Sequence, residues 1–380
     1  MPENWKTFTL GDLVTFQRGH DLPKTQMTIG KYPVAGSNGI IGFHDEFTTK
    51  APSITIGRSG NIGNPHYYKT DFWAHNTTLY IKEFKGSHPK FVYYFLKTLD
   101  FKGHNSGSAV PSLNRNYIHP IEIKVPPIEE QRRIAEILSA LDEKIELNLE
   151  MNRTLEKIAQ ATFKHWFVDF QFPGFDGELV DGLPKGWRKE KINNLAKSIQ
   201  YGFTQSSSND PTGYKFLRIT DIQGGTVKWS QIPYCKTSEN EFKKYKIVDH
   251  DIFIARTGAS TGENVYVTDA PDAVFASYLI RVQFDNPHLA LYVGKFLRRT
   301  EYFGYVASIM GGSAQPNANA QELTSIEITV PTNDILEKYF DVVNEMNKRK
   351  ITNEQQNQTL TQIRNGLLPK LMSGKIRVAE

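Results

Sequence analysis

Apolar and polar side chains follow a helical period along one unusually long stretch, residues 128–163. The stretch holds no proline or glycine, two prolines precede it, and two glutamates lie in its expected first turn. Its apolar positions recur in steps of three, four or multiples of these, at Ile134, Leu138, Leu141, Ile145 and Leu155. At ~1.5 Å per residue, such a helix is roughly 54 Å long. The pattern therefore predicts one amphipathic helix that acts as a spacer.

A second amphipathic stretch, residues 334–368, repeats the first. The segment NRTL at residues 152–155 returns as NQTL at 357–360, and the same offset carries IEIKVP (121–126) onto IEITVP (326–331). Further upstream the offset changes, as expected for loop insertions, but GRSG at residues 57–60 is answered by ARTG at 255–258. We interpret the chain as a tandem duplication in which each copy is a globule followed by a long helix.

In the segments outside the long helices, the period shortens to that of strands and tight turns. In the first globule it predicts strands at residues 53–57, 78–82 and 121–125 and a short helix at 90–99. In the second it predicts strands at residues 215–219, 251–255, 276–282 and 325–330 and a helix at 289–299. The pattern indicates a mixed α/β (α+β) fold in each copy.

A linker rich in glycine, proline and acidic residues separates the two copies. At 380 residues and 39% hydrophobic, the chain is long enough for a core in each globule. We expect five parts: residues 1–127 as the first globule, 128–170 as the central helix, 171–186 as the linker, 187–331 as the second globule, and 332–380 as the C-terminal helix and tail.

The long helices carry asparagines where a heptad pattern expects apolar residues. Asn148 and Asn152 fall in the seam of the first helix, and Asn353 and Asn357 lie at the matching points of the second. A buried asparagine costs stability unless it finds a polar partner, and its usual role is to fix register. The four could satisfy one another in an antiparallel coiled coil with pseudo-twofold symmetry and a globule at each end. In the alternative, each helix packs only on its own globule.

Composition and charge limit the classes of function that this chain can have. The net charge is only +4, but basic residues outnumber acidic ones in both globules, whereas acidic residues dominate the central helix and the linker. That distribution suits two globules that contact a polyanion, although ordinary charge fluctuation accounts for it equally well. A single cysteine, Cys235, excludes a disulfide framework and favours a cytoplasmic location. We predict neither a signal peptide nor a membrane span.

The motifs of nucleotide-binding loops, dinucleotide folds and zinc proteases do not occur in the sequence, and the histidines lack metal-ligand spacing. The run Glu122-Ile123-Lys124 resembles the end of a nuclease metal motif, but its duplicate at residues 327–329 loses the lysine. An edge strand is the simpler interpretation. We therefore predict no catalytic residue and no metal ligand in this chain.

Binding chemistry is more plausible in the loops of the globules. Arginine, asparagine and glutamine read guanine and adenine edges, while glycine and serine let the backbone approach phosphates. The same residues also form ordinary turns. The DNA-binding candidates of the first globule are Ser37, Asn38, Arg58, Ser59, Asn61, His75, Asn76, Ser108 and Arg115. Those of the second are Gln200, Tyr201, Thr204, Arg218, Asp221, Arg256, Thr257, Ser277, Gln315 and Asn317.

Several sequence runs together resemble the specificity subunits of Type I restriction-modification systems. Besides the globule-helix-globule-helix order, they are PENW (2–5), LGDL (10–13), YPVAGSNGIIG (32–42), IEIKVPPIEEQ (121–131), WFVDF (166–170) and GLPKGW (182–187). The resemblance covers nearly the whole chain. The second copy departs from it: GWR (186–188) and VPTN (330–333) are looser versions, and the recognition loops differ almost entirely.

The resemblance implies that each globule is a target-recognition domain and that the helices are spacers in an antiparallel coiled coil. It implies a non-catalytic subunit that binds double-stranded DNA and assembles with two methyltransferase subunits and with restriction subunits. S-adenosylmethionine and ATP with magnesium would belong to those partners, with no cofactor bound by this chain. The target would be an asymmetric bipartite site, whose two half-sites differ because the loops differ.

Two other classes of function remain open from the residues alone. A self-contained DNA-modifying enzyme would methylate or nick DNA without a partner. A coiled-coil interaction protein without DNA specificity would lack the salt-dependent DNA affinity that phosphate contacts produce.

Overall fold

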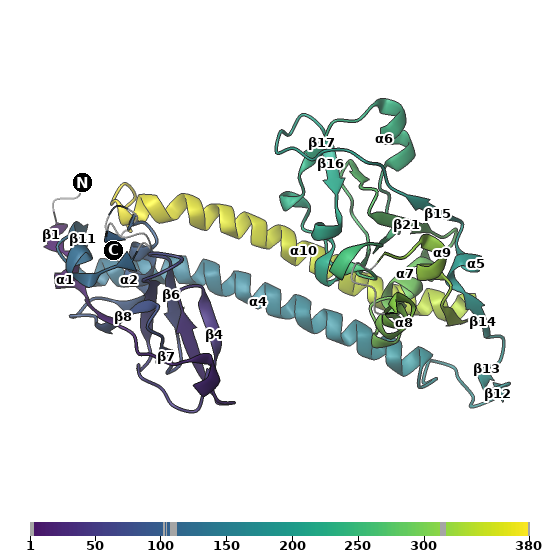
Figure 1. The fold of residues 1–380 in the computed structure, drawn as a ribbon, viewed down its shortest axis with the longest axis horizontal. Coiled ribbons are helices and arrows are strands. Elements are labelled where there is room, and N and C mark those ends of the chain that lie inside the picture. The colour runs from purple at the N-terminus through teal and green to yellow at the C-terminus, as the bar shows by residue number, and fades with distance from the viewer. Residues whose placement is uncertain (1–3, 102, 104, 107–111, 312–316, 379–380) are drawn as a thin grey trace. The chain divides into compact units, whose positions relative to one another are not determined.

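The computed structural model describes residues 4–101, 103, 105–106, 112–311 and 317–378. It divides into two compact units: unit 1 comprises Met1–Met151 with Thr352–Glu380, and unit 2 comprises Asn152–Ile351. The two long helices, α4 (Ile128–Phe167) and α10 (Asn333–Met372), each run through both units (Figure 1). Each unit therefore consists of one globule and about half of each long helix.

Unit 1 is built on two sheets and two small strand pairs. The four-stranded sheet has the order β2 (Thr15–Arg18), β8 (Thr78–Glu83), β5 (Ser53–Gly57) and β6 (Pro65–Tyr68). The three-stranded sheet has the order β4 (Gly39–His44), β3 (Tyr32–Gly36) and β7 (Trp73–Ala74). The small pairs are β1 (Lys6–Thr9) with β11 (Glu122–Val125), and β9 (Asn105–Ser106) with β10 (Ser112–Leu113); the short helices are α1 (Leu10–Leu13), α2 (Pro89–Leu96) and α3 (Arg115–Ile118).

Unit 2 repeats this plan with the same strand orders. Its four-stranded sheet is β15 (Ser198–Tyr201), β21 (Leu279–Gln283), β18 (Ile252–Ala255) and β19 (Asn264–Tyr266), and its three-stranded sheet is β17 (Tyr234–Cys235), β16 (Tyr214–Leu217) and β20 (Ala273–Phe275). The pairs are β14 (Arg188–Lys191) with β22 (Glu327–Val330), and β12 (Leu179–Val180) with β13 (Leu183–Pro184). Its helices are α5 (Ile192–Leu195), α6 (Glu239–Tyr245), α7 (Pro287–Phe296), α8 (Thr300–Met310) and α9 (Ala320–Thr324). The repeated strand order confirms the internal duplication and the mixed fold class.

The long helices contribute to the core of both units. In unit 1, Leu138 of α4 and Leu371 of α10 join the cluster that contains Phe16, Ile54 and Phe91. The cluster of unit 2 includes residues of α4, α10, α7 and β18: Phe163, Tyr339, Tyr292 and Ile254. Burial of this apolar surface is the main force that holds each globule to its helices.

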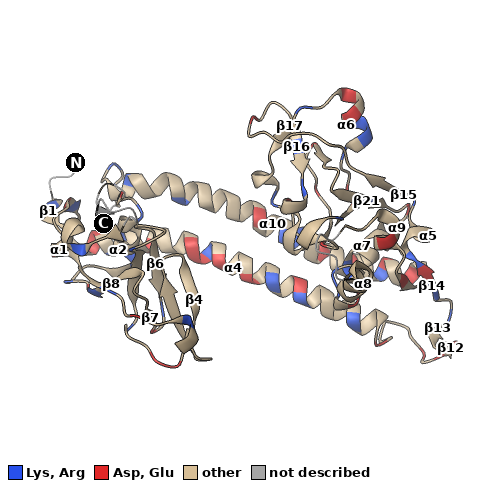
Figure 2. Cartoon of the chain, viewed as in Figure 1, with Lys and Arg blue, Asp and Glu red and all other residues tan. Residues whose placement is uncertain are grey.

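Within each unit the two long helices run antiparallel, as predicted. In unit 1, Asn148 Nδ2 donates to Asn357 Oδ1 at 2.8 Å, and Arg364 Nη1 donates to Asp142 Oδ1 at 2.5 Å, so that residue numbers rise along one helix as they fall along the other. In unit 2, Tyr339 Oη donates to Ala159 O at 3.4 Å. Acidic and basic residues are interspersed along α4 (Figure 2).

The asparagines take part in this pairing. Asn148 is fully buried and also donates to Gln356 Oε1 at 2.8 Å, while Asn357 Nδ2 donates back to Ile145 O at 3.3 Å. In unit 2, Asn152 Nδ2 donates to Lys350 O at 3.4 Å. Asn353 is buried in unit 1. Polar partners are thus present for the amide nitrogen of Asn148 and for both polar atoms of Asn357, whereas the buried Oδ1 of Asn148 has no hydrogen-bond partner among the described residues. The role of all four asparagines in fixing register stays a prediction.

Some element boundaries differ from those predicted. Helix α4 continues past residue 163 to Phe167, because Trp166 and Phe167 pack into the core of unit 2. The strand predicted at 215–219 ends at Leu217, because Asp221 accepts a hydrogen bond from Arg218 N and the chain turns into a short 3₁₀ helix. The strand predicted at 276–282 begins only at Leu279. The strand prediction for Glu122-Ile123-Lys124 is confirmed: β11 pairs with β1 and alternates exposed and buried residues.

Candidate nucleic-acid interface

In unit 1, several candidate residues gather where the strands of the two sheets end. Arg58 follows the fully buried strand β5 directly, and its backbone is held from both sides. Its N–H donates to Thr77 O at 2.8 Å, and Leu113 N donates to its carbonyl oxygen at 2.8 Å. Its Nη1 donates to Asn76 O at 3.4 Å. These bonds fix the backbone of Arg58 and leave most of its guanidinium donors available.

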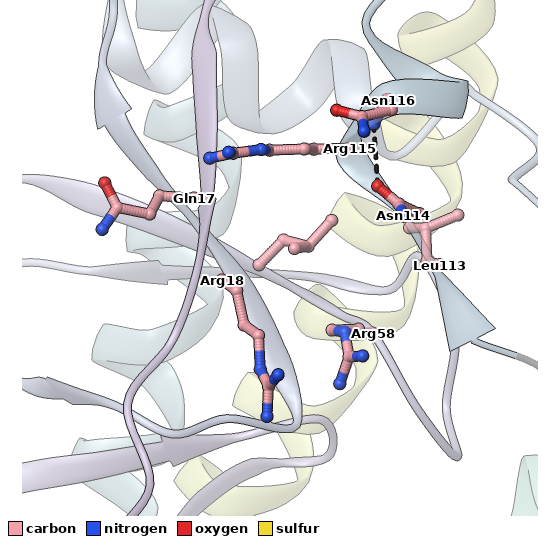
Figure 3. Close-up of a pocket in the computed structure, with 8 residues that line it drawn as sticks. Gln17, Arg18, Arg58, Leu113, Asn114, Arg115 and Asn116 are labelled. Atoms are coloured by element: carbon pink, nitrogen blue, oxygen red, sulfur yellow. Dashed lines mark hydrogen bonds between the residues drawn. The ribbon is translucent and has the colours of Figure 1, made fainter.

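A pocket of about 670 Å³ opens at this point, lined by Gln17, Arg18, Arg58, Leu79, Leu113, Asn114, Arg115 and Asn116 (Figure 3). The side chains of Arg18 and Arg58 point the same way, and that of Arg115 extends across toward Gln17 (Figure 3). Asn114 positions Arg115, because its side chain caps α3 by accepting a hydrogen bond from Asn116 N at 3.0 Å.

The charge of this pocket is strongly positive. Among the described residues, only Asp21 brings a carboxylate within 4 Å of the three guanidinium groups. Its Oδ1 lies 3.9 Å from Arg18 Nη2, and both side chains are more than half exposed. Such a loose, solvated ion pair neutralises little charge. Three like charges around one pocket favour an anionic partner such as a phosphate or an electronegative base edge.

The turn between β3 and β4 borders the same site. A Cβ placed on Gly57 would lie 3.4 Å from Ser37 Cβ, and one on Gly60 would lie 3.7 Å from Ser37 Oγ. A Cβ on Gly57 would also lie 1.7 Å from Asn61 O, so the tight loop that carries Ser59 and Asn61 requires glycine there. Ser59 forms a bridge with Ser112. Ser37, Arg58, Ser59 and Asn61 are therefore brought together, and Asn38 follows Ser37 in the same turn.

The turn between β7 and β8 carries His75 and Asn76. His75 Nδ1 lies 2.9 Å from Thr77 Oγ1, and Asn76 Nδ2 donates to Asp21. The end of β2 approaches this turn so closely that a Cβ on Gly19 would lie 2.2 Å from His75 O. Eight candidates thus lie at one edge of unit 1: Ser37, Asn38, Arg58, Ser59, Asn61, His75, Asn76 and Arg115. The ninth, Ser108, lies outside the described residues.

In unit 2, Arg256 occupies the position equivalent to Arg58. It follows the buried strand β18, its N–H donates to Tyr278 O at 3.1 Å, and Ala318 N donates to its carbonyl oxygen at 3.0 Å. Its guanidinium carbon lies 5.0 Å from the centre of the Tyr201 ring, and its buried Nε has no hydrogen-bond partner among the described residues. Tyr201 Oη in turn accepts a hydrogen bond from Ala320 N at 2.8 Å.

Four further candidates of unit 2 lie close in pairs. Thr204 Oγ1 donates to Ser277 Oγ at 3.1 Å, and Thr257 forms a bridge with Asn317. The second pair flanks Arg256. Thr257 follows Arg256 in the chain, and Asn317 precedes Ala318, whose N–H donates to the carbonyl oxygen of Arg256. Gln315 lies outside the described residues.

Three other candidates of unit 2 are engaged within the unit itself. Arg218 donates through Nε and Nη2 to both carboxylate oxygens of Asp221, at 2.9 and 3.0 Å, and these hydrogen bonds raise the pKa of Arg218. Gln200 donates to Lys244 O at 3.4 Å and accepts from Arg281. These side chains are less available for a partner than Arg256.

Sequence reasoning missed Gln17, Arg18, Asn114 and Asn116, which line the unit 1 pocket. A signal for Arg18 was present in the duplication, because Arg18-Gly19 and Tyr201-Gly202 occupy equivalent places. A Cβ on Gly202 would lie 2.3 Å from Ala276 O, and a Cβ on Gly19 would lie 2.2 Å from His75 O, so both glycines are packed against a neighbouring backbone. The residue before each glycine therefore ends its strand beside the site.

The family model for the Type I restriction modification DNA specificity domain matches residues 2–157 and again residues 184–362. The chain belongs to this family. A role in the DNA sequence specificity of restriction-modification systems follows from membership, and the two matched segments correspond to the two copies recognised in the sequence. The family resemblance inferred from the short sequence runs is therefore confirmed.

Two curated relatives match most of the length of this chain, which we call the specificity subunit. It is 27% identical to the Type I restriction enzyme MjaIX specificity subunit of Methanocaldococcus jannaschii, covering 77% of this chain and 70% of the relative. It is 26% identical to the HindI specificity subunit of Haemophilus influenzae, covering 87% and 82%. The crystal structure of the S subunit from M. genitalium shares the fold, with a TM-score of 0.65 at 17% identity over 97% of this chain and 96% of that one.

The described residues contain neither a membrane-spanning helix nor a cluster of metal ligands. None of the helices in this part of the specificity subunit is long and apolar enough to cross a membrane. No group of three or more histidine, cysteine, aspartate or glutamate side chains in the same part could hold a metal ion. The single cysteine, Cys235, is buried, and burial raises the pKa of its thiol to about 11.

Proposed function

We propose that this specificity subunit reads an asymmetric bipartite DNA site, with one short block of bases recognised by each unit. The observation that carries the proposal is the equivalence of Arg58 and Arg256. Each follows the buried central strand of its unit, and the backbone of each is held by the same pair of hydrogen bonds. Arginine at such a rigid position can make the bidentate contact to guanine that is the commonest specific contact in DNA recognition.

The two half-sites differ in sequence, because the neighbours of the two arginines differ. Arg58 lies among other arginines and asparagines, whereas Arg256 stacks on Tyr201. The donors and acceptors offered to the base edges are therefore different in the two units. Candidates that already bind within their own unit, such as Arg218 and Gln200, act mainly by shaping their loops.

The long helices fix the number of unread base pairs between the two blocks. Two readers on one face of B-DNA must lie about one helical turn, ~34 Å, apart or a multiple of it. The buried contact between Asn148 and Asn357 supports this role, because an asparagine pair in an apolar seam penalises any slip of one helix along the other.

The chemistry belongs to partner subunits. Two methyltransferase subunits, which carry S-adenosylmethionine and methylate adenine N6, dock along the helices, and restriction subunits that use ATP and magnesium join for cleavage. The specificity subunit supplies no catalytic residue and binds no cofactor itself. Family membership supports these partners, and the number of each is part of the proposal.

A binding selection tests the reading of two blocks. The full chain, co-purified with a methyltransferase subunit from its own host, selects duplexes from a randomised library, and the bound fraction is sequenced. We expect two short motifs separated by a constant gap. A single continuous motif would contradict the proposal, as would two motifs separated by variable gaps.

A further inference from the structure

The pocket in unit 1 differs from the equivalent place in unit 2 by two substitutions that change its charge. The strand-ending residue is Arg18 in unit 1 and Tyr201 in unit 2, each before a glycine whose N–H bonds across to the neighbouring strand, Gly19 N to Thr78 O at 3.0 Å and Gly202 N to Leu279 O at 3.2 Å. The residue after the cap of the following short helix is Arg115 in unit 1 and Ala320 in unit 2.

These substitutions have opposite consequences. In unit 2, Tyr201 closes the site on itself: its ring stacks under Arg256 and its hydroxyl accepts from Ala320 N. In unit 1, Arg18 and Arg115 leave an open pocket of about 670 Å³ around Arg58, with no carboxylate closer to it than the loose contact of Asp21 among the described residues. Among the described residues, the Arg18 side chain has only the loose contact with Asp21, and both arginines are exposed. Both cations are therefore available to bind an anionic partner.

We propose that Arg18 and Arg115 form a phosphodiester clamp in unit 1, in which each holds one DNA backbone phosphate beside the base read by Arg58. This inference rests on the proposed DNA-reading function and extends it, because it divides the work unequally between the units. Unit 1 supplies more of the salt-dependent, sequence-independent affinity, and unit 2 contributes mainly recognition.

The geometry agrees with this division. Arg18 and Arg58 point to the same side of the pocket, and Arg115 extends from the capped helix α3 toward Gln17 on the other side of the pocket (Figure 3). Planar guanidinium groups bind phosphate oxygens with two parallel hydrogen bonds, so arginines on two different elements can each hold a phosphate of the same DNA segment. Phosphate contacts fix the position of a protein on the duplex and carry no sequence information.

The test is a salt titration with the full chain on two unrelated, fluorescently labelled duplexes, followed by anisotropy. The variants Arg18→Tyr and Arg115→Ala give unit 1 the residues of unit 2, and both wild-type side chains are exposed, so folding is preserved. Each variant is expected to reduce the slope of log K against log salt by about one. Between about 50 and about 200 mM salt, the loss of affinity then becomes about fourfold smaller than for the wild-type chain.

Arg132→Ala is the matched control. Arg132 lies on α4 in unit 1, is 55% exposed and pairs with Glu129 at 3.1 Å, so its loss changes the net charge equally without touching the pocket. The clamp is supported if Arg18→Tyr and Arg115→Ala lower the slope on both duplexes and Arg132→Ala does not. It is overturned if all three variants behave alike, or if the slope is unchanged while wild-type binding is normal. Absence of DNA binding by the wild-type chain would instead overturn the proposed function together with the clamp.

Discussion

Each unit fastens its globule to the long helices through a carboxylate, but the two carboxylates lie in different surroundings. In unit 1, Asp142 of α4 accepts from Tyr94 Oη of α2 at 2.6 Å and from Arg364 Nη1 of α10 at 2.5 Å, and the charged side chains retain 27% and 23% exposure. The equivalent contact in unit 2 is made by Glu156 of α4 with Lys295 of α7, whose side chain is almost fully buried. The comparison shows one architecture held by two kinds of polar contact.

In unit 2, Glu156 of α4 binds two lysines. Lys295 Nζ of α7 lies 3.0 Å from both carboxylate oxygens, and Lys350 Nζ of α10 lies 2.7 Å from one of them. The Lys295 side chain is only 9% exposed, and burial lowers its pKa against the attraction of Glu156. A charge that has left water depends on its partner far more than one that remains solvated. Unit 2 should therefore be the more sensitive of the two to loss of its carboxylate.

The largest expected effect is that of Glu156→Ala. It leaves the buried ammonium of Lys295 without a counter-charge, which costs unit 2 about 3 kcal/mol, the lower end for breaking a buried pair, because Glu156 itself is partly exposed. Chemical denaturation monitored by hydrogen exchange measures this loss in unit 2 separately. The control is Asp142→Ala, which should destabilise unit 1 by about 1 to 2 kcal/mol. Equal losses would show that burial of the lysine is unimportant.

Acid should loosen unit 2 through the same carboxylate. Burial opposes ionisation of Glu156, but the attraction of Lys295 and Lys350 outweighs it and lowers the pKa of Glu156 to about 2, from an ordinary value of 4.5. Because the folded pKa is the lower one, the stabilisation is fully present above about pH 4.5 and is lost as the pH falls toward 2. Denaturation curves at several pH values, compared between wild type and Glu156→Gln, isolate this contribution. A difference that does not vary with pH in that range would contradict it.

The two arginines provide the corresponding comparison for recognition. Arg58→Ala should cost about 1 to 3 kcal/mol of binding and relax one position of one half-site, and Arg256→Ala should do the same in the other half-site. Binding to a panel of single-base variants of the target measures both. If either variant weakens binding uniformly across the panel, that arginine contacts a phosphate and reads no base.

The smallest expected effect concerns the seam between the helices in unit 1. Asn148→Ala removes two amide hydrogen bonds and leaves Asn357 partly unpaired, at a cost of about 1 to 2 kcal/mol. It should also broaden the range of gaps accepted between the two half-sites, because the restraint on helix register is lost. Selection from duplexes with varied gaps measures this. The control is Asn365→Ala, an α10 residue whose side chain accepts hydrogen bonds from the adjacent Arg364. If the variant prefers one gap as strictly as the wild-type chain does, Asn148 does not set the spacing between the half-sites.

Sequence patterns predicted the features that depend on local periodicity. Strand β5 has the predicted bounds, and both long helices were found because an apolar stripe repeats along them. The duplication also identified Arg58 and Arg256 as equivalent, which the two sheets bear out. These features need no knowledge of which strands pair.

Features that depend on tertiary pairing were not predictable. The duplication marks the place of Arg18 through Tyr201, but it does not reveal the pocket, which forms because β2 lies beside β8 and ends near a turn far away in sequence. Lys295, Glu156 and Lys350 come from three separate helices, and no spacing rule connects them. The ion pair of Arg218 with Asp221 shows the converse, since two residues chosen as candidate readers instead bind each other.

Genome-wide mapping of N6-methyladenine tests the central claim most directly. It compares cells carrying the intact chain and its methyltransferase with cells in which the chain is deleted or carries Arg58→Ala or Arg256→Ala. We predict one gapped, bipartite motif that disappears on deletion, with a different half relaxed by each substitution. A motif that persists without the chain, or that both substitutions alter in the same half, would contradict the account of two units reading two blocks.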